Sequence, residues 1–154
     1  KDMTAGQLHD LLAELGAKTL KQTLERLKAG TLERIPQSES EATYAPMLNK
    51  DTGRIDWAKS AEEIYNLIRG TNPWPGAYTI YRGEKMKVHQ AEVLSKSGLG
   101  KEPGTICKVG REGIEVACGQ GTIRILQIQF ESCRSMTVGE YICGHKIDEG
   151  EVLG

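Results

Sequence analysis

The sequence has few of the features that mark fibrous, membrane-spanning or disordered proteins. Of its 154 residues, 38% are hydrophobic and 27% are charged, and no stretch approaches the roughly 18 apolar residues that span a bilayer. Its 20 basic residues are balanced by 21 acidic ones, whereas domains that bind nucleic acid through overall charge usually have a pI above about 9. We therefore predict one or two small folded cores, no membrane segment, and only local contact with any polyanion.

Closely spaced cysteines are also missing. The four cysteines are separated by ten or more residues, without a C-x-x-C pair. This spacing argues against a metal site and against thiol redox chemistry. It favours reduced, mostly structural cysteines in a cytoplasmic protein. Cys107 and Cys118 fall in strand patterns, where we expect them to pack in the core.

Groups for catalysis and for base stacking are scarce. His9, His89 and His145 lie apart from one another, on the first helix, in a strand and near the C-terminus, which predicts surface or packing roles and no catalytic residue in this chain. The chain has one Phe, two Trp and five Tyr, and several of these occupy positions expected in a core. Stacking on unpaired bases is therefore less expected than contact with the backbone of a folded RNA.

The first third of the chain reads as a helix followed by a linker. The chain begins at Lys1 without an initiator Met, which suggests an internal piece of a longer protein. Within residues 1–30, leucines at spacings of three and four predict a helix of about 23 residues that starts at a Thr4–Gln7 capping box and stops at Gly30. Its apolar stripe needs a partner surface. Residues 31–52 lose this periodicity and predict an extended linker.

Residues 53–154 predict a small β domain with short helices. Capping boxes at Ser60–Glu63 and Thr137–Glu140 mark two helix starts, and Gly119–Gly121 reads as a hairpin turn. Two slips in the apolar alternation predict β-bulges that bend long strands. The fold class is α+β, mainly β: an OB-like Greek-key barrel, preceded by the long helix and the linker. Its five strands are expected at residues 77–81, 85–94, 105–109, 113–117 and 122–130.

Charge is distributed unevenly within this nearly neutral chain. Between residues 69 and 111 there are eight basic and three acidic residues, whereas residues 112–154 hold three basic and seven acidic ones. A basic sector on an OB-type barrel suits phosphate contacts. Charged strand faces can equally stay solvated, and charge alone leaves both interpretations open.

One octapeptide carries a family resemblance. Residues 72–79 read Asn-Pro-Trp-Pro-Gly-Ala-Tyr-Thr, and this run resembles the signature of the C-terminal domain of methionyl-tRNA formyltransferases. The segments Ala42–Pro46 and Arg54–Trp57 resemble the linker of that family, and Thr4–Gly16 resembles the last helix of its catalytic domain. The resemblance covers nearly the whole chain.

The resemblance implies an activity and a division of labour. Family members transfer a formyl group from 10-formyltetrahydrofolate to the amino group of methionine on initiator tRNA, with the catalytic residues in a Rossmann-like domain that would precede Lys1. The present chain would then position the tRNA in translation initiation and be inactive alone, with no cofactor of its own. The implied nucleic-acid-binding residues are Lys50, Arg54, Arg69, Arg82, Lys85 and Lys87.

Some features keep a second interpretation open. Met47 and the pair Ser132–Cys133 stand where relatives often carry positive charge, and Trp74, framed by two prolines, is expected to pack in a buried junction rather than contact a ligand. The reduced charge would also suit a spacer domain of a related formyltransferase that acts on a nucleotide-sugar or hydrolyses formyl-folate. The complete octapeptide and Lys50 favour the tRNA enzyme.

Overall fold

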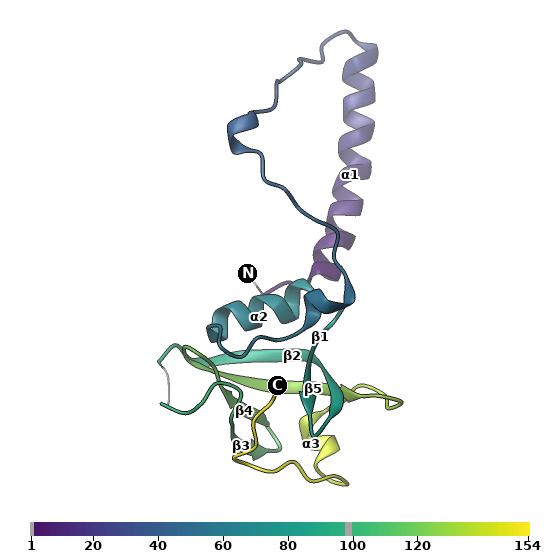
Figure 1. Cartoon of the computed structure of the whole chain (residues 1–154). Coiled ribbons are helices and arrows are strands. Elements are labelled where there is room, and N and C mark those ends of the chain that lie inside the picture. The colour runs from purple at the N-terminus through teal and green to yellow at the C-terminus, as the bar shows by residue number, and fades with distance from the viewer. Residues whose placement is uncertain (1, 98–99) are drawn as a thin grey trace. The chain divides into compact units, whose positions relative to one another are not determined.

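The computed structural model describes residues 2–97 and 100–154, in two compact units (Figure 1). One unit contains residues 2–5 and 49–154, and the other contains residues 6–48. None of the helices in the described residues combines the length and apolar composition that crossing a membrane requires.

Residues 6–48 hold the predicted long helix. Helix α1 (Ala5–Lys28) has 24 residues and contains no buried side chain, so its leucine stripe is exposed in the described chain. The helix stops where Gly30 adopts a φ of +70°, a conformation that glycine tolerates best. The amides of Gly30 and Thr31 bond back to the carbonyls of Leu27 and Arg26. A short 3-10 turn, η1 (Glu39–Glu41), interrupts the otherwise extended segment that follows.

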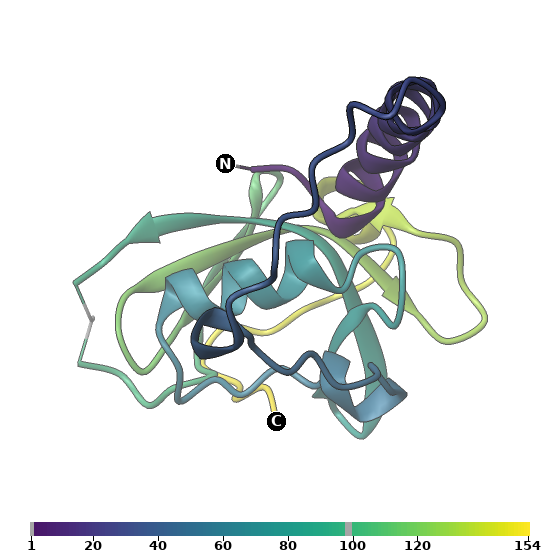
Figure 2. The ribbon, with the colours of Figure 1, turned by 90° about the horizontal axis from the view of Figure 1, so that it is seen from above.

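The second helix covers the sheet of the other unit. Helix α2 (Ala61–Gly70) begins with the predicted capping box, in which Ser60 Oγ accepts from the Glu63 amide and the Glu63 carboxylate accepts from the Ser60 amide at 3.0 Å. Its buried residues Ile64 and Ile68 belong to the hydrophobic core. The helix packs on β2 and β5 and runs roughly along them (Figure 2).

The sheet is antiparallel throughout, with the strand order β1-β2-β5-β4-β3. The predicted α+β, mainly β class is confirmed, and each predicted strand lies within one residue of an observed one. A sixth strand of two residues is too short to give a recognisable alternation, and the sequence did not reveal it. The elements are β1 (Ala77–Tyr81), β2 (Glu84–Ser95), β3 (Ile106–Gly110), β4 (Gly113–Ala117), β5 (Thr122–Phe130), β6 (Met136–Thr137) and α3 (Val138–Tyr141).

The predicted bulges lie where β2 and β5 pair. Val88 faces Ile128, but Ala91 faces Ile125, and the register shifts between these pairs. Both strands therefore change phase at the same place, which keeps apolar side chains on the core side through the bend. Met86, Val88, Ile125 and Ile128 are all buried.

The predicted closed barrel of five strands is not formed by the strand pairing. The strand path is open and ends at β1 and β3. The C-terminal segment, residues 150–154, bonds instead to both edges (Figure 1). The amides of Ile106 and Ile80 donate to the carbonyls of Glu151 and Gly154, each at 2.8 Å. These few residues lack the alternation of a strand, so the sequence did not reveal that they would occupy this position.

Candidate nucleic-acid interface

Two lysines are placed side by side by the alternation of β2. Lys85 and Lys87 flank Met86, which is fully buried, so both lysine side chains lie on the outer face of the sheet. Lys87 pairs with Tyr78 of β1 on one side and with Gln129 of β5 on the other. The ammonium of Lys85 lies 3.6 Å from the centre of the Tyr78 ring, a cation–π contact that directs this side chain across the sheet surface.

A third lysine comes from a turn near the start of the unit that contains the sheet. The 3-10 turn η2 (Lys50–Gly53) is fixed by a capping box between Asn49 and Thr52, with the Thr52 amide donating to Asn49 Oδ1 at 3.0 Å. Gly53 packs directly on the loop before β1, where a Cβ would lie only 2.1 Å from the carbonyl oxygen of Gly76. Only glycine permits this approach, which keeps Lys50 next to the loop that carries Trp74.

The three lysines line one cavity of about 530 Å³. This volume falls within the usual range of ligand pockets. We call it the lysine cavity. No ion pair among the described residues involves these three lysines, and Glu131 is the one carboxylate on the wall. The residues that line it are Lys50, Trp74, Pro75, Lys85, Lys87, Gln129, Phe130, Glu131 and Ser132.

Polar groups of the cavity wall are held by a short hydrogen-bond chain. Gln129 Oε1 lies 2.8 Å from His89 Nε2, and the Gln129 amide nitrogen donates to the Cys133 carbonyl at 2.9 Å. The hydrogen-bond partner of the His89 ring is thus the Gln129 side chain and not a nucleophile. The amide side chain of Gln129 is held against the cavity by partners on both of its ends.

None of the three predicted arginines lines the lysine cavity. Arg54 is exposed at the end of η2, and its backbone bridges to Tyr78 of β1. Arg69 lies on α2, donates to Asn66 Oδ1 at 2.9 Å, and lines a different, mixed-charge cavity that also contains Glu62 and Glu92. Of the six implied binding residues, only the three lysines line the cavity.

Arg82 is engaged in an ion pair network at the turn between β1 and β2. Its Nε donates to Glu151 Oε1 at 2.9 Å, and its guanidinium also pairs with Asp148. These hydrogen bonds raise the pKa of Arg82, and the same contact lowers the pKa of the Glu151 carboxyl. The pKa of Asp148 is lowered first by Lys146 and then by Arg82. Arg82 thus attaches the C-terminal segment to β1, with two carboxylates already on its guanidinium.

This network makes stability sensitive to acid. Because the carboxyl pKa values of Asp148 and Glu151 are lowered in the folded state, their contribution is complete above the ordinary values of about 4 and is lost as the pH falls through the lowered values. We expect Arg82→Gln to lower the melting temperature modestly at pH 7 and by less at pH 3, which lies below the ordinary pKa values of both carboxyls. Thermal melts at both pH values test this. An equal loss at the two pH values would contradict the ion-pair explanation.

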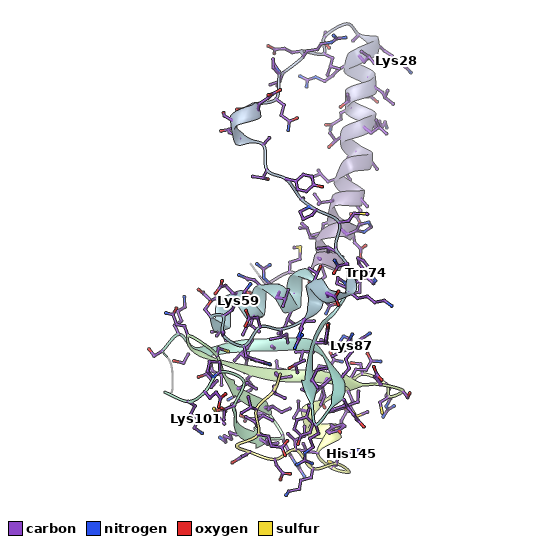
Figure 3. The ribbon with its side chains drawn as sticks, viewed as in Figure 1. Lys28, Lys59, Trp74, Lys87, Lys101 and His145 are labelled. Carbon is purple, nitrogen blue, oxygen red and sulfur yellow. The ribbon has the colours of Figure 1, made fainter. Side chains whose placement is uncertain are left out.

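Trp74 corrects an expectation from the sequence. Its side chain is 59% exposed, so the predicted buried junction is wrong. Hydrogen bonds on either side of Trp74 hold its loop in place. The Gly76 amide donates to the Thr71 carbonyl at 2.8 Å, and the Asn72 side chain donates to the His89 carbonyl at 3.0 Å. The buried tryptophan is Trp57, which donates to Thr79 Oγ1 at 3.0 Å. Trp74 and Lys87 lie on the same side of the domain (Figure 3).

Comparison with known proteins decides the family. Residues 47–146 match the family model described as formyl transferase, C-terminal domain. The chain belongs to this formyl transferase family. It is 58% identical over 153 residues to a methionyl-tRNA formyltransferase of Acetivibrio thermocellus and 49% identical to one of Clostridium acetobutylicum. Each comparison covers 99% of this chain and 49% of the relative, so the chain spans about half the length of the curated relatives it matches.

Solved structures share the fold of this formyl transferase domain. A variant of HypX from Aquifex aeolicus matches 98% of the chain, and 30% of its own length, with a TM-score of 0.66 and 16% identity. The HypX complex with tetrahydrofolic acid matches 83% of the chain and 25% of its own length, with a TM-score of 0.56 and 16% identity. At such identities the likeness concerns the fold alone.

The remaining sequence expectations concern isolated residues of the formyl transferase domain. Burial raises the pKa of the Cys118 thiol to about 11, as expected for a core cysteine, whereas Cys107 is only half-buried. No cluster of metal-ligating side chains occurs in residues 2–97 and 100–154. Of the residues that were expected to depart from the family pattern, Met47 is exposed and Ser132 lines the lysine cavity.

Proposed function

We propose that this chain is the C-terminal part of a methionyl-tRNA formyltransferase and that it holds initiator methionyl-tRNA through the lysine cavity. The convergence of Lys50, Lys85 and Lys87 on one cavity carries this proposal, because a nearly neutral chain can bind a polyanion only where unpaired cations gather. The 58% identity to a methionyl-tRNA formyltransferase supports initiator methionyl-tRNA as the RNA. In this proposal the sheet and the C-terminal segment serve as an OB-like barrel, a fold that commonly binds oligonucleotides.

The proposed role is positional rather than catalytic. Formyl transfer from 10-formyltetrahydrofolate would take place in a Rossmann-like domain upstream, on which the exposed leucine stripe of α1 would pack. Holding the tRNA beside that domain turns a chance encounter into an oriented reaction. The lysines would bind the tRNA backbone, since ammonium groups contact phosphates irrespective of base sequence.

Binding of the 154-residue chain to initiator tRNA, titrated with salt, tests the proposal. We expect binding that weakens steeply as salt rises, because each neutralised phosphate releases counterions, and we expect no formyl transfer by this chain alone. A nucleotide-sugar is the control ligand. Absence of tRNA binding at low salt would contradict the proposal, and preference for the nucleotide-sugar would favour a domain from a different formyltransferase.

A further inference from the structure

Trp74 is an exposed aromatic ring on the wall of the lysine cavity. We propose that this cavity binds an unpaired nucleotide of the RNA, whose base stacks on Trp74 while Lys50, Lys85 and Lys87 contact the neighbouring phosphates. This inference rests on the proposed function and adds to it the kind of RNA segment that is recognised. It departs from the sequence-based expectation, in which stacking on unpaired bases was less expected than contact with the backbone of a folded RNA.

The exposure of Trp74 is the first observation. Its side chain is 59% exposed, although indole is among the largest apolar groups that a protein can bury. The other tryptophan, Trp57, is 5% exposed and has its indole nitrogen bonded to Thr79. Trp74 is therefore available to a ligand, and Trp57 is not.

The way the ring is held is the second observation. Prolines at positions 73 and 75 flank Trp74, and backbone or side-chain hydrogen bonds anchor the loop on both sides of it. The close contact between Gly53 and Gly76 adds a third attachment, to the turn that carries Lys50. A ring presented on a rigid loop loses little freedom on binding, so more of the stacking energy appears as affinity.

The composition of the cavity is the third observation. The wall of the lysine cavity contains the Trp74 ring, the three lysine ammonium groups and the hydrogen-bonded side-chain amide of Gln129. Aromatic rings and basic groups are the combination by which proteins bind single-stranded nucleic acid. Gln129 adds an amide group that can form hydrogen bonds with the edge of a base or with a 2′-hydroxyl.

Duplex RNA would use only part of this site. Paired bases are stacked on one another inside a helix and offer no free face to Trp74, whereas their phosphates remain accessible to lysine. The structure therefore separates two contributions: Trp74 should matter for unpaired nucleotides alone, and the lysines should matter for both forms of RNA.

Binding of two RNA probes to the 154-residue chain tests the inference. The probes are a single-stranded oligonucleotide and a blunt-ended duplex of two strands with the same total number of phosphates, compared in the parent chain and in Trp74→Ala and Trp74→Phe variants. We expect Trp74→Ala to weaken single-strand binding about tenfold, with substantial recovery in Trp74→Phe and no change for the duplex. Tryptophan fluorescence should be quenched by the single strand in the parent chain, but not in Trp74→Phe, which retains only Trp57.

The outcomes separate this inference from the proposed function. Equal single-strand affinity in the parent chain and Trp74→Ala, or the same loss for the duplex, would overturn stacking on Trp74. Retained salt-dependent tRNA binding by Trp74→Ala would at the same time leave the proposed function intact. Melting curves of both variants establish that they are folded, which is expected because the ring is exposed.

Discussion

Replacing Leu153 with Ala is expected to lower the free energy of unfolding by about 2–5 kcal/mol, the usual cost of truncating a buried leucine. Leu153 is 2% exposed and belongs to the hydrophobic core, although it is the second-last residue of the chain. Residues this close to a terminus commonly tolerate substitution. The large expected effect follows from the place of the C-terminal segment between the two sheet edges.

Deletion of residues 150–154 should destabilise the domain further. The segment accepts from the amides of Ile80 and Ile106, and its own amides donate to the carbonyls of Gly104, Ile80 and Ile106. Its loss would leave both edges of the sheet unpaired and would expose the core beneath Leu153. It would also remove Glu151 from Arg82.

Chemical denaturation followed by circular dichroism measures both changes. Val152→Ala is the matched control, because Val152 is the adjacent residue in the same segment but is 49% exposed. We expect Val152→Ala to lower the free energy of unfolding by much less than Leu153→Ala does. Equal midpoints for the two variants would contradict the view that the C-terminal segment completes the core.

The local elements of the fold could be predicted because their signals lie in neighbouring residues. The Ser60–Glu63 and Thr137–Glu140 capping boxes each start a helix as expected. The slip of the apolar phase after Val88 identified a real register shift, since a bulge changes which side chains face the core. The C-terminal segment joins the two sheet edges through hydrogen bonds to Ile80 and Ile106, which lie far from it in the sequence. No pattern among neighbouring residues predicts such contacts.

The candidate site was predictable to the same extent. Lys85 and Lys87 could be placed together because the alternation around Met86 is local. Lys50 was implied only by the family resemblance, and its approach to them depends on the contact of Gly53 with Gly76. Arg82 could not be separated from the lysines in advance, because its partners Asp148 and Glu151 follow more than 60 residues later.

Trp74 illustrates a different limit. Two flanking prolines restrict the backbone, but a restricted backbone does not decide which way a side chain faces. Large aromatic residues are usually buried, which made a packing role the natural expectation. The exposed side chain at this position is therefore the kind of departure from local rules that accompanies a binding site.

The double variant Lys85→Ala/Lys87→Ala should weaken tRNA binding and reduce the slope of log K against log salt by about 2, because two phosphate contacts are lost. The fold should be retained, since both side chains lie on the outer face of β2. The matched control is Lys59→Ala/Lys101→Ala, which removes the same charge from the opposite side of the domain (Figure 3). An unchanged slope in the first variant would exclude the lysine cavity as the phosphate-binding site.

A change of opposite sign in the same cavity completes this test. Glu131→Gln removes the carboxylate from the cavity wall and leaves the three lysines in place. Since a like charge near a phosphate opposes binding, this variant should bind tRNA more tightly at low salt, and the gain should fade as salt screens the repulsion. We expect tighter tRNA binding in Glu131→Gln, weaker binding in Lys85→Ala/Lys87→Ala, and no change in Lys59→Ala/Lys101→Ala. This pattern would assign binding to the local charge of the lysine cavity, because all three variants leave the net charge of the chain close to neutral.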